Sequence, residues 1–169
     1  MDLKQYISSE LEGVDRGAAR VLDTLSQEEV SWRPACGCNS MGLIFFHAIK
    51  SEDNFIQKTL QDKPTLWESE KWFNKLDMDM NEAGSHYDID QVNAFVVPDI
   101  KDLVEYYKQT RKATLDYLDT LAPDDFDRKI TLPFGEFTVA GVFSVIVRHA
   151  AQHMGEISYL RGMLRGMDK

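Results

Sequence analysis

The stretch from Val139 to Arg165, VAGVFSVIVRHAAQHMGEISYLRGMLR, has the apolar periodicity of one long amphipathic helix, and Thr138 before it is a suitable N-cap. Its apolar side chains and three polar ones recur every three or four residues. At about 100° per residue they fall within an arc roughly 120° wide. The members of this arc are Val142, Val145, Ile146, His149, His153, Glu156, Ile157, Leu160 and Leu164. Two imidazoles and a carboxylate therefore stand in a stripe that should face the core.

The polar residues in this stripe need partners, because a buried polar group without one costs about 1–3 kcal/mol. His149 and His153 are four residues apart, so both rings can point at one position, which is how helices present metal ligands. A divalent cation offsets the desolvation of its ligands. The pair, with Glu156 one turn further on, therefore predicts a metal site. The alternative is a polar core network without a metal.

Three other segments have the same period, which makes the fold class all-α. They run from about Leu3 to Leu25, from about Ser40 to Leu60, and from Asp99 to about Leu121, where Ser40 and Asp99 can act as N-caps. Together with the C-terminal helix they predict a four-helix bundle. The chain length of 169 residues suggests that residues 1–169 form a single domain.

The connections between these helices bear on topology. The long crossover between helices 2 and 3, residues 61–97, can span the length of the bundle and so permits an up-down-down-up order. Its tryptophans suggest that it packs on the bundle, with a short helix at about residues 66–76. Residues 128–132 and 136–138 flank Pro133-Phe134-Gly135, which predicts a small hairpin.

Composition and charge exclude several classes of function. The net charge is −9 and the pI is about 4.9, so a polyanion such as nucleic acid is repelled, and anionic membrane surfaces are disfavoured. The longest nearly apolar stretch, Val139 to Val147, is far shorter than the ~20 residues that span a bilayer. The N-terminus has no apolar region typical of a signal peptide, which predicts a cytoplasmic protein.

The two cysteines, Cys36 and Cys38, are separated only by Gly37. Neighbours this close rarely form a structural disulfide, so we expect two reduced thiols in a loop. A redox or metal role is the alternative, including one in which the protein's own thiol takes part in the chemistry.

Periodicity does not place the other two histidines in a site. His47 lies outside the apolar arc of its helix, beside Ser51 and Asn54, whereas Glu52 falls inside that arc. His47 is therefore either a ligand near the open end of the bundle or a surface histidine. His86 stands among small and polar residues that are typical of a loop.

Three pieces of the sequence resemble the DinB/YfiT-like superfamily of damage-inducible, metal-binding four-helix bundles. They are Trp32-Arg33-Pro34 with Asn39-Ser40-Met41-Gly42-Leu43-Ile44-Phe45-Phe46-His47, then Leu132-Pro133-Phe134-Gly135, and then Arg148-His149-Ala150-Ala151-Gln152-His153-Met154-Gly155-Glu156-Ile157. They occur in the family's order, and the resemblance covers nearly the whole chain. It implies that His47, His149 and His153 bind one divalent metal ion.

One residue departs from the family pattern, which often has Gly-Gln where this chain has Gly155-Glu156. A carboxylate here could orient an imidazole, hold a water at the metal, act as a base, or pair with an arginine. Glu156 is therefore the candidate catalytic residue.

Three neutral imidazoles leave positions open on a metal ion, unlike the closed four-ligand structural sites. We expect zinc or nickel, with iron or manganese chemically possible. The resemblance implies a metal-dependent enzyme that transfers a low-molecular-weight thiol to an electrophile or hydrolyses a small molecule. The alternative is a non-catalytic stress-response protein with a structural or sensory metal. The resemblance also implies a homodimer.

The long connection should wall the pocket of such a site. Its candidate wall residues are Trp67, Trp72, Phe73, His86 and Tyr87.

Overall fold

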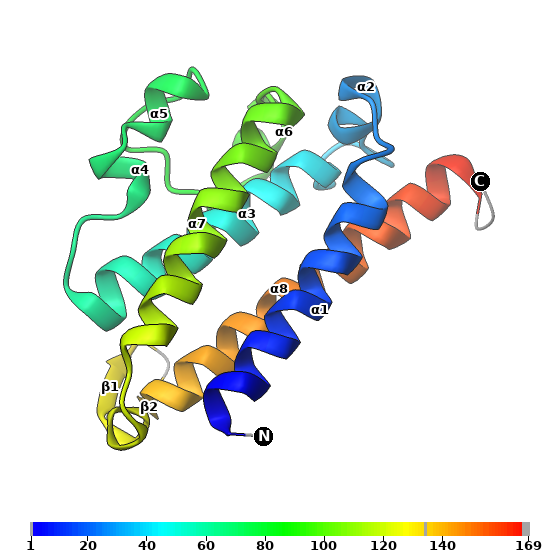
Figure 1. Ribbon diagram of the computed structural model, residues 1–169. Coiled ribbons are helices and arrows are strands. Elements are labelled where there is room, and N and C mark those ends of the chain that lie inside the picture. Colours follow the sequence, from blue (N-terminus) through cyan, green and yellow to red (C-terminus); the bar gives the residue numbers. More distant parts are fainter. Residues whose placement is uncertain (1, 134, 167–169) are drawn as a thin grey trace.

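The computed structural model describes residues 2–133 and 135–166. Over these residues the protein is mostly helical, with one small antiparallel sheet, so the all-α prediction is confirmed (Figure 1). The longest elements are α1 (Leu3–Leu22), α3 (Met41–Asp53), α7 (Ile100–Thr120) and α8 (Val139–Arg165). A π-helical segment, η1 (Asn54–Leu60), continues α3 without a break in the chain direction.

Shorter elements occupy the connections. They are α2 (Gln27–Ser31), α4 (Leu66–Ser69), α5 (Trp72–Lys75), α6 (Ile89–Ala94), the 3-10 turn η2 (Pro123–Asp127), β1 (Lys129–Leu132) and β2 (Gly135–Thr138). The single short helix expected at residues 66–76 is two helices, because Lys71 takes a left-handed conformation between them (φ 54°). Neither α2 nor α6 was predicted.

The predicted caps hold the long helices at the expected residues. Ser40 accepts a hydrogen bond from the Leu43 amide, Asp99 from the Lys101 amide, and Thr138 from the Gly141 amide. The first helix ends at Leu22, three residues before the predicted Leu25. The apolar period continues past the helix end because Leu25 is itself buried in the turn that leads to α2.

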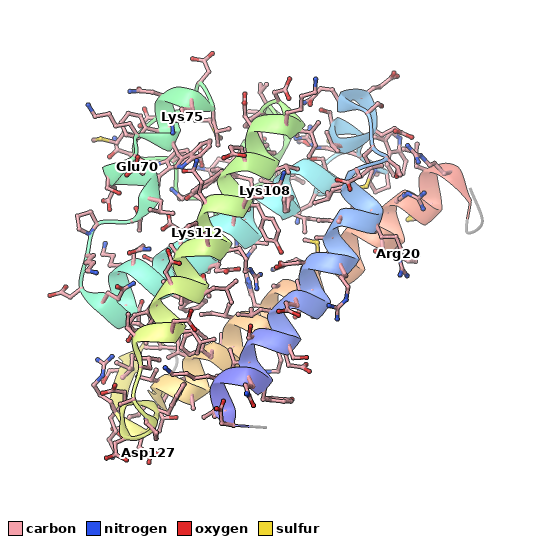
Figure 2. The ribbon with its side chains drawn as sticks, viewed as in Figure 1. Arg20, Glu70, Lys75, Lys108, Lys112 and Asp127 are labelled. Carbon is pink, nitrogen blue, oxygen red and sulfur yellow. The ribbon has the colours of Figure 1, made fainter. Side chains whose placement is uncertain are left out.

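Two apolar clusters fill the interior. Helices α1, α7 and α8 contribute residues to both clusters, whereas α3 contributes to one and its extension η1 to the other. Helix α8 packs against both α1 and α3, and α3 also packs against α7. In Figure 1, α1 and α8 lie side by side, and α7 crosses over α3. Charged side chains such as Arg20 on α1 and Lys108 and Lys112 on α7 are exposed (Figure 2).

Two acidic side chains next to each other on α3 are nevertheless buried. Glu52 accepts hydrogen bonds from Arg111 (3.0 Å) and from the Thr114 hydroxyl (2.7 Å), both on α7. Asp53 accepts from the amides of Leu66 and Trp67 at the start of α4. A buried carboxylate is tolerated only with such partners, which explains why Glu52 lies inside an apolar arc.

The predicted hairpin is present. Strands β1 and β2 pair with Lys129 opposite Thr138 and Leu132 opposite Gly135. Phe134, in the predicted turn, lies outside the described residues. The hairpin leads directly into α8, whose N-cap Thr138 is its last strand residue. No helix in the described part of the chain has the length and apolar character to cross a membrane.

Candidate metal centre

Three histidine side chains from two helices converge at one position. The Nε2 atom of His149 lies 3.2 Å from Nε2 of His47 and 3.1 Å from Nε2 of His153. One ligand nitrogen from each of the three residues lies within 4.8 Å of the other two. The structure therefore brings together the three residues that the sequence predicts as metal ligands.

The packing of α3 against α8 is what brings His47 to the other two histidines. Helix α3 is buried on nearly every side, because α2, α7, α8 and the crossover all contact it. A helix of this kind has no single apolar arc, so its wheel could not show which way His47 points. On α8 the four-residue spacing alone places His149 and His153 on one face.

Two of the three rings are held by hydrogen bonds at the nitrogen that faces away from the cluster. Nδ1 of His47 donates to the carbonyl oxygen of Gly84 (2.7 Å). Nδ1 of His153 donates to Oε2 of Glu156 (2.7 Å). Because both acceptors lack a proton to give, each Nδ1 carries the hydrogen, and in the neutral ring Nε2 then presents a lone pair to the cluster. Outer partners of this kind orient histidine ligands in metal sites.

This arrangement fits a cation better than a hydrogen-bonded network. His149 Nε2 carries at most one hydrogen, so it can donate a hydrogen bond to only one of its two close neighbours. Between neutral rings, the other contact then brings two nitrogen lone pairs together at hydrogen-bond distance. Two imidazole nitrogens on tetrahedral zinc, each about 2.05 Å from the ion, are roughly 3.3 Å apart. The two observed separations are close to that value.

Electrostatics favour the neutral form of His149 and His47 and the charged form of Glu156. Burial, aided by the neighbouring histidines, lowers the pKa of His149 to about 4. Burial also lowers the pKa of His47, although its bond to Gly84 opposes this shift. Partial burial of Glu156 acts to raise its pKa, but hydrogen bonds from Gln152 and His153 outweigh it and lower that pKa.

A cavity of about 320 Å³ adjoins the cluster, and we call it the metal chamber. His47, His153 and Glu156 form part of its wall, and the segment from Gly84 to Tyr87 forms another part. The predicted wall residues His86 and Tyr87 therefore do line it. The cluster thus has an adjoining space in which a small molecule can reach the metal position.

The other predicted wall residues lie elsewhere. Trp67 and Trp72 are buried in the core, where both rings pack on Tyr106, and Phe73 packs against Trp67. Their role as walls of the pocket is therefore wrong. Large aromatic rings are stabilised more by full burial than by lining a wet cavity.

The cysteines stand outside the histidine cluster. Both are free thiols in the loop before α3, with Cys36 exposed and Cys38 half-buried. The side-chain amide of Asn93 donates to Cys36 Sγ, and its oxygen accepts from the Gly37 amide. The expected pair of reduced thiols in a loop agrees with this geometry.

Gly84 is the site residue that sequence reasoning missed. It takes a left-handed conformation (φ +72°), and a Cβ there would be 3.1 Å from the Lys50 side chain. The sequence offers a weak signal, a lone glycine in a polar loop, and nothing in it points to a carbonyl that holds His47. That contact spans 37 residues and exists only in the folded chain.

Comparison with known proteins agrees with the fold. A solved structure described as a conserved protein from Enterococcus faecalis superposes with a TM-score of 0.85 at 21% identity, covering 98% of this chain and 99% of that one. No curated protein matches the sequence. The family model described as the DinB superfamily matches residues 10–157, so the chain belongs to the DinB superfamily.

Proposed function

We propose that this protein is a metal-dependent enzyme that acts on a small molecule, by transfer of a low-molecular-weight thiol to an electrophile or by hydrolysis. One observation carries the proposal: the Nε2 atoms of three half-buried imidazoles meet beside a chamber that two of those imidazoles line. Three protein ligands and an adjoining space are typical of catalytic rather than structural metal sites.

The residues of the site have different proposed roles. His47, His149 and His153 would hold zinc or nickel, and iron or manganese are the chemical alternatives. When bound, such an ion supplies Lewis acidity, which lowers the pKa of a thiol or water and polarises a carbonyl. The Gly84 carbonyl fixes the ring of His47, and the Glu156 carboxylate fixes the ring of His153.

Glu156 has a second proposed task. Its lowered pKa keeps it ionised at neutral pH, and it lies on the chamber wall as well as against His153. It can therefore accept the proton that a thiol or a water loses when its sulfur or oxygen attacks the electrophile.

Two measurements test the proposal. Elemental analysis of untagged protein should find about one equivalent of a transition metal per chain, and His149→Ala should abolish it, while His86→Ala, outside the cluster, should retain it. The metal-loaded protein should consume thiol with a model electrophile faster than His149→Ala does. If the protein is fully occupied by metal but catalyses neither thiol transfer nor ester hydrolysis, the proposed enzymatic activity is refuted and only a non-catalytic role of the metal is left.

We also propose an up-down-down-up order for the four long helices. It is supported by the course of the chain in Figure 1, which runs one way along α1 and α8 and the opposite way along α3 and α7. The crossover from residue 61 to 97 joins the two helices that run in the same direction, as a long connection permits.

A homodimer in the cytoplasm is the proposed state of the protein. Leu3 and Tyr6, three residues apart on α1, expose 42% and 52% of their surface, which a second copy could cover. Free thiols at Cys36 and Cys38 suit a reducing compartment. Sedimentation equilibrium tests the dimer, and Leu3→Ser with Tyr6→Ser should weaken it if this face is used.

A further inference from the structure

A second hollow adjoins the metal chamber. It is an open cleft of about 750 Å³ along the C-terminal half of α8, and we call it the α8 cleft. Asn39, Ile44 and Glu156 line both the chamber and the cleft. The two spaces therefore meet at these three residues, next to the histidine cluster.

The far part of the α8 cleft is apolar and unusually exposed. Tyr159 and Met163, one turn apart on α8, leave 70% and 52% of their surface uncovered, and Leu160 lies between them. These two open apolar side chains give the cleft an apolar surface that an apolar ligand can cover. Pro34 and Cys38, from the loop before α3, also line the cleft.

The floor of the cleft contains a glycine where a helix would favour another residue. Gly155 is in the middle of α8, and a Cβ built on it meets no atom within 4 Å. Glycine in a helix interior is less favourable than alanine. The packing of the protein therefore does not require Gly155, whereas an occupant of the cleft would use the space that it leaves.

We propose that the α8 cleft binds the apolar part of the substrate whose reactive head occupies the metal chamber. The inference rests on the proposed function, because it takes the metal as the anchor of the head. The substrate class is then an amphipathic small molecule with a metal-binding head and an extended apolar tail.

Geometry and charge define this substrate further. Ten residues of helix separate His153 from Met163, a rise of about 15 Å, so the tail is long enough to be a chain or a ring system rather than a methyl group. The Glu156 carboxylate lies at the junction of the two spaces, where it accepts a hydrogen bond from His153. The part of the substrate that passes it is therefore neutral or cationic.

The test uses linear hydroxamates, from acetohydroxamate to decanohydroxamate, titrated calorimetrically into the zinc-loaded full chain. The head group chelates a metal with open positions, and only the tail varies. Affinity should rise about two- to fourfold per added methylene until the cleft is filled, as expected for half to full burial of each group. A flat series would overturn the inference.

Variants of α8 locate the tail. Gly155→Leu should fill the cleft and abolish the gain with chain length, while acetohydroxamate still binds and zinc content is unchanged. Gly162→Leu is the matched control: it is on the same helix, its Cβ also meets nothing within 4 Å, and it is not part of the cleft lining. Equal losses in both variants would contradict the placement.

Tyr159→Ser with Met163→Ser should weaken long hydroxamates only, and both side chains are exposed enough to change without unfolding. If the cleft were a contact between two copies, the chain-length series would be flat and Gly155→Leu would change the oligomeric state, which would refute the inference. Failure of acetohydroxamate to bind to stoichiometric zinc would refute the open metal position, a different failure from a flat series.

Discussion

In the proposed metal site, Glu156 accepts one hydrogen bond from the outer nitrogen of His153. Glu156→Ala should therefore weaken zinc binding about 10–100-fold, the usual loss when an outer partner of a histidine ligand is removed. Glu156→Gln should lose less affinity, because its amide oxygen can still accept from Nδ1, but it cannot take up a proton and should lose activity. Competition with a chromophoric chelator measures the affinities.

The exposed Glu70 at the end of α4 provides the control, since Glu70→Ala removes the same charge from a residue that does not line the metal chamber (Figure 2). If Glu156→Ala bound zinc as tightly as Glu70→Ala does, Glu156 would have no positioning role.

Lys50, one turn after His47 on α3, gives a pH-dependent prediction. Burial lowers its pKa to about 8 from an ordinary 10.5, although Asp53 attracts its charge, and its ammonium lies 3.9 Å from the Trp67 ring. Between these two pKa values the unfolded chain binds more protons at Lys50 than the folded chain does. The contribution of Lys50 to the free energy of unfolding should therefore increase as the pH rises from 8 to 10.5.

Chemical denaturation of the wild type and of Lys50→Met across this window measures that contribution as the difference between the two curves. Other groups that titrate here are common to both proteins and cancel. Parallel curves would show that Lys50 has an ordinary pKa.

The residues of the candidate site could be predicted from the sequence to different extents. His149 and His153 share a helix, and a fixed geometry links sequence spacing to direction, so the pair could be recognised directly. His47 could not, because its direction depends on how α3 is enclosed by several elements. Its place in the cluster came from the resemblance to a family, and the folded structure supplies the geometry.

At the level of elements, Asp53 joins α3 to the crossover. Its carboxylate accepts from the amides of Leu66 (2.9 Å) and Trp67 (3.0 Å) at the start of α4 and from the hydroxyl of Tyr106 (2.7 Å), and it is only 1% exposed. Asp53→Asn replaces one acceptor oxygen by a donor, which leaves at least one buried donor unpaired. We expect a loss of about 1–3 kcal/mol in the free energy of unfolding.

Urea denaturation measures this loss, with Asp62→Asn as the control, because Asp62 is exposed and asparagine tolerates its left-handed backbone (φ 54°). A loss no larger than the control's would mean that the crossover is held by apolar contacts alone. The crossover that Asp53 holds continues to Gly84, whose carbonyl oxygen accepts from His47. Asp53→Asn should therefore also weaken zinc binding.

The long helices and their caps were predictable, because periodicity accumulates over several turns and a cap is a local hydrogen bond. Helices α2 and α6 were not, since each has too few residues to show a period. The break at Lys71 between α4 and α5 also has no local cause in the sequence, because lysine does not favour a left-handed conformation.

At the scale of the whole molecule, charge and topology were only partly predictable. The net charge of −9 describes the surface but says nothing about where cavities form. The chamber and the α8 cleft arise where the crossover, the loop before α3 and α8 meet, and these segments are far apart in the sequence. No local pattern encodes such a junction.

Metal binding should stabilise the whole fold, because its ligands come from two helices that separate on unfolding. A ligand that binds only the native state at about 100 times its Kd adds about 2.7 kcal/mol to the free energy of unfolding. For a domain of this size that corresponds to roughly 5–11 °C in Tm. Calorimetry of the zinc-loaded protein with and without a chelator should show this shift, and His149→Ala should show none. Because the stabilisation follows from mass action alone, an unchanged Tm at saturating zinc would mean that the native state has no such site, whatever its catalytic activity.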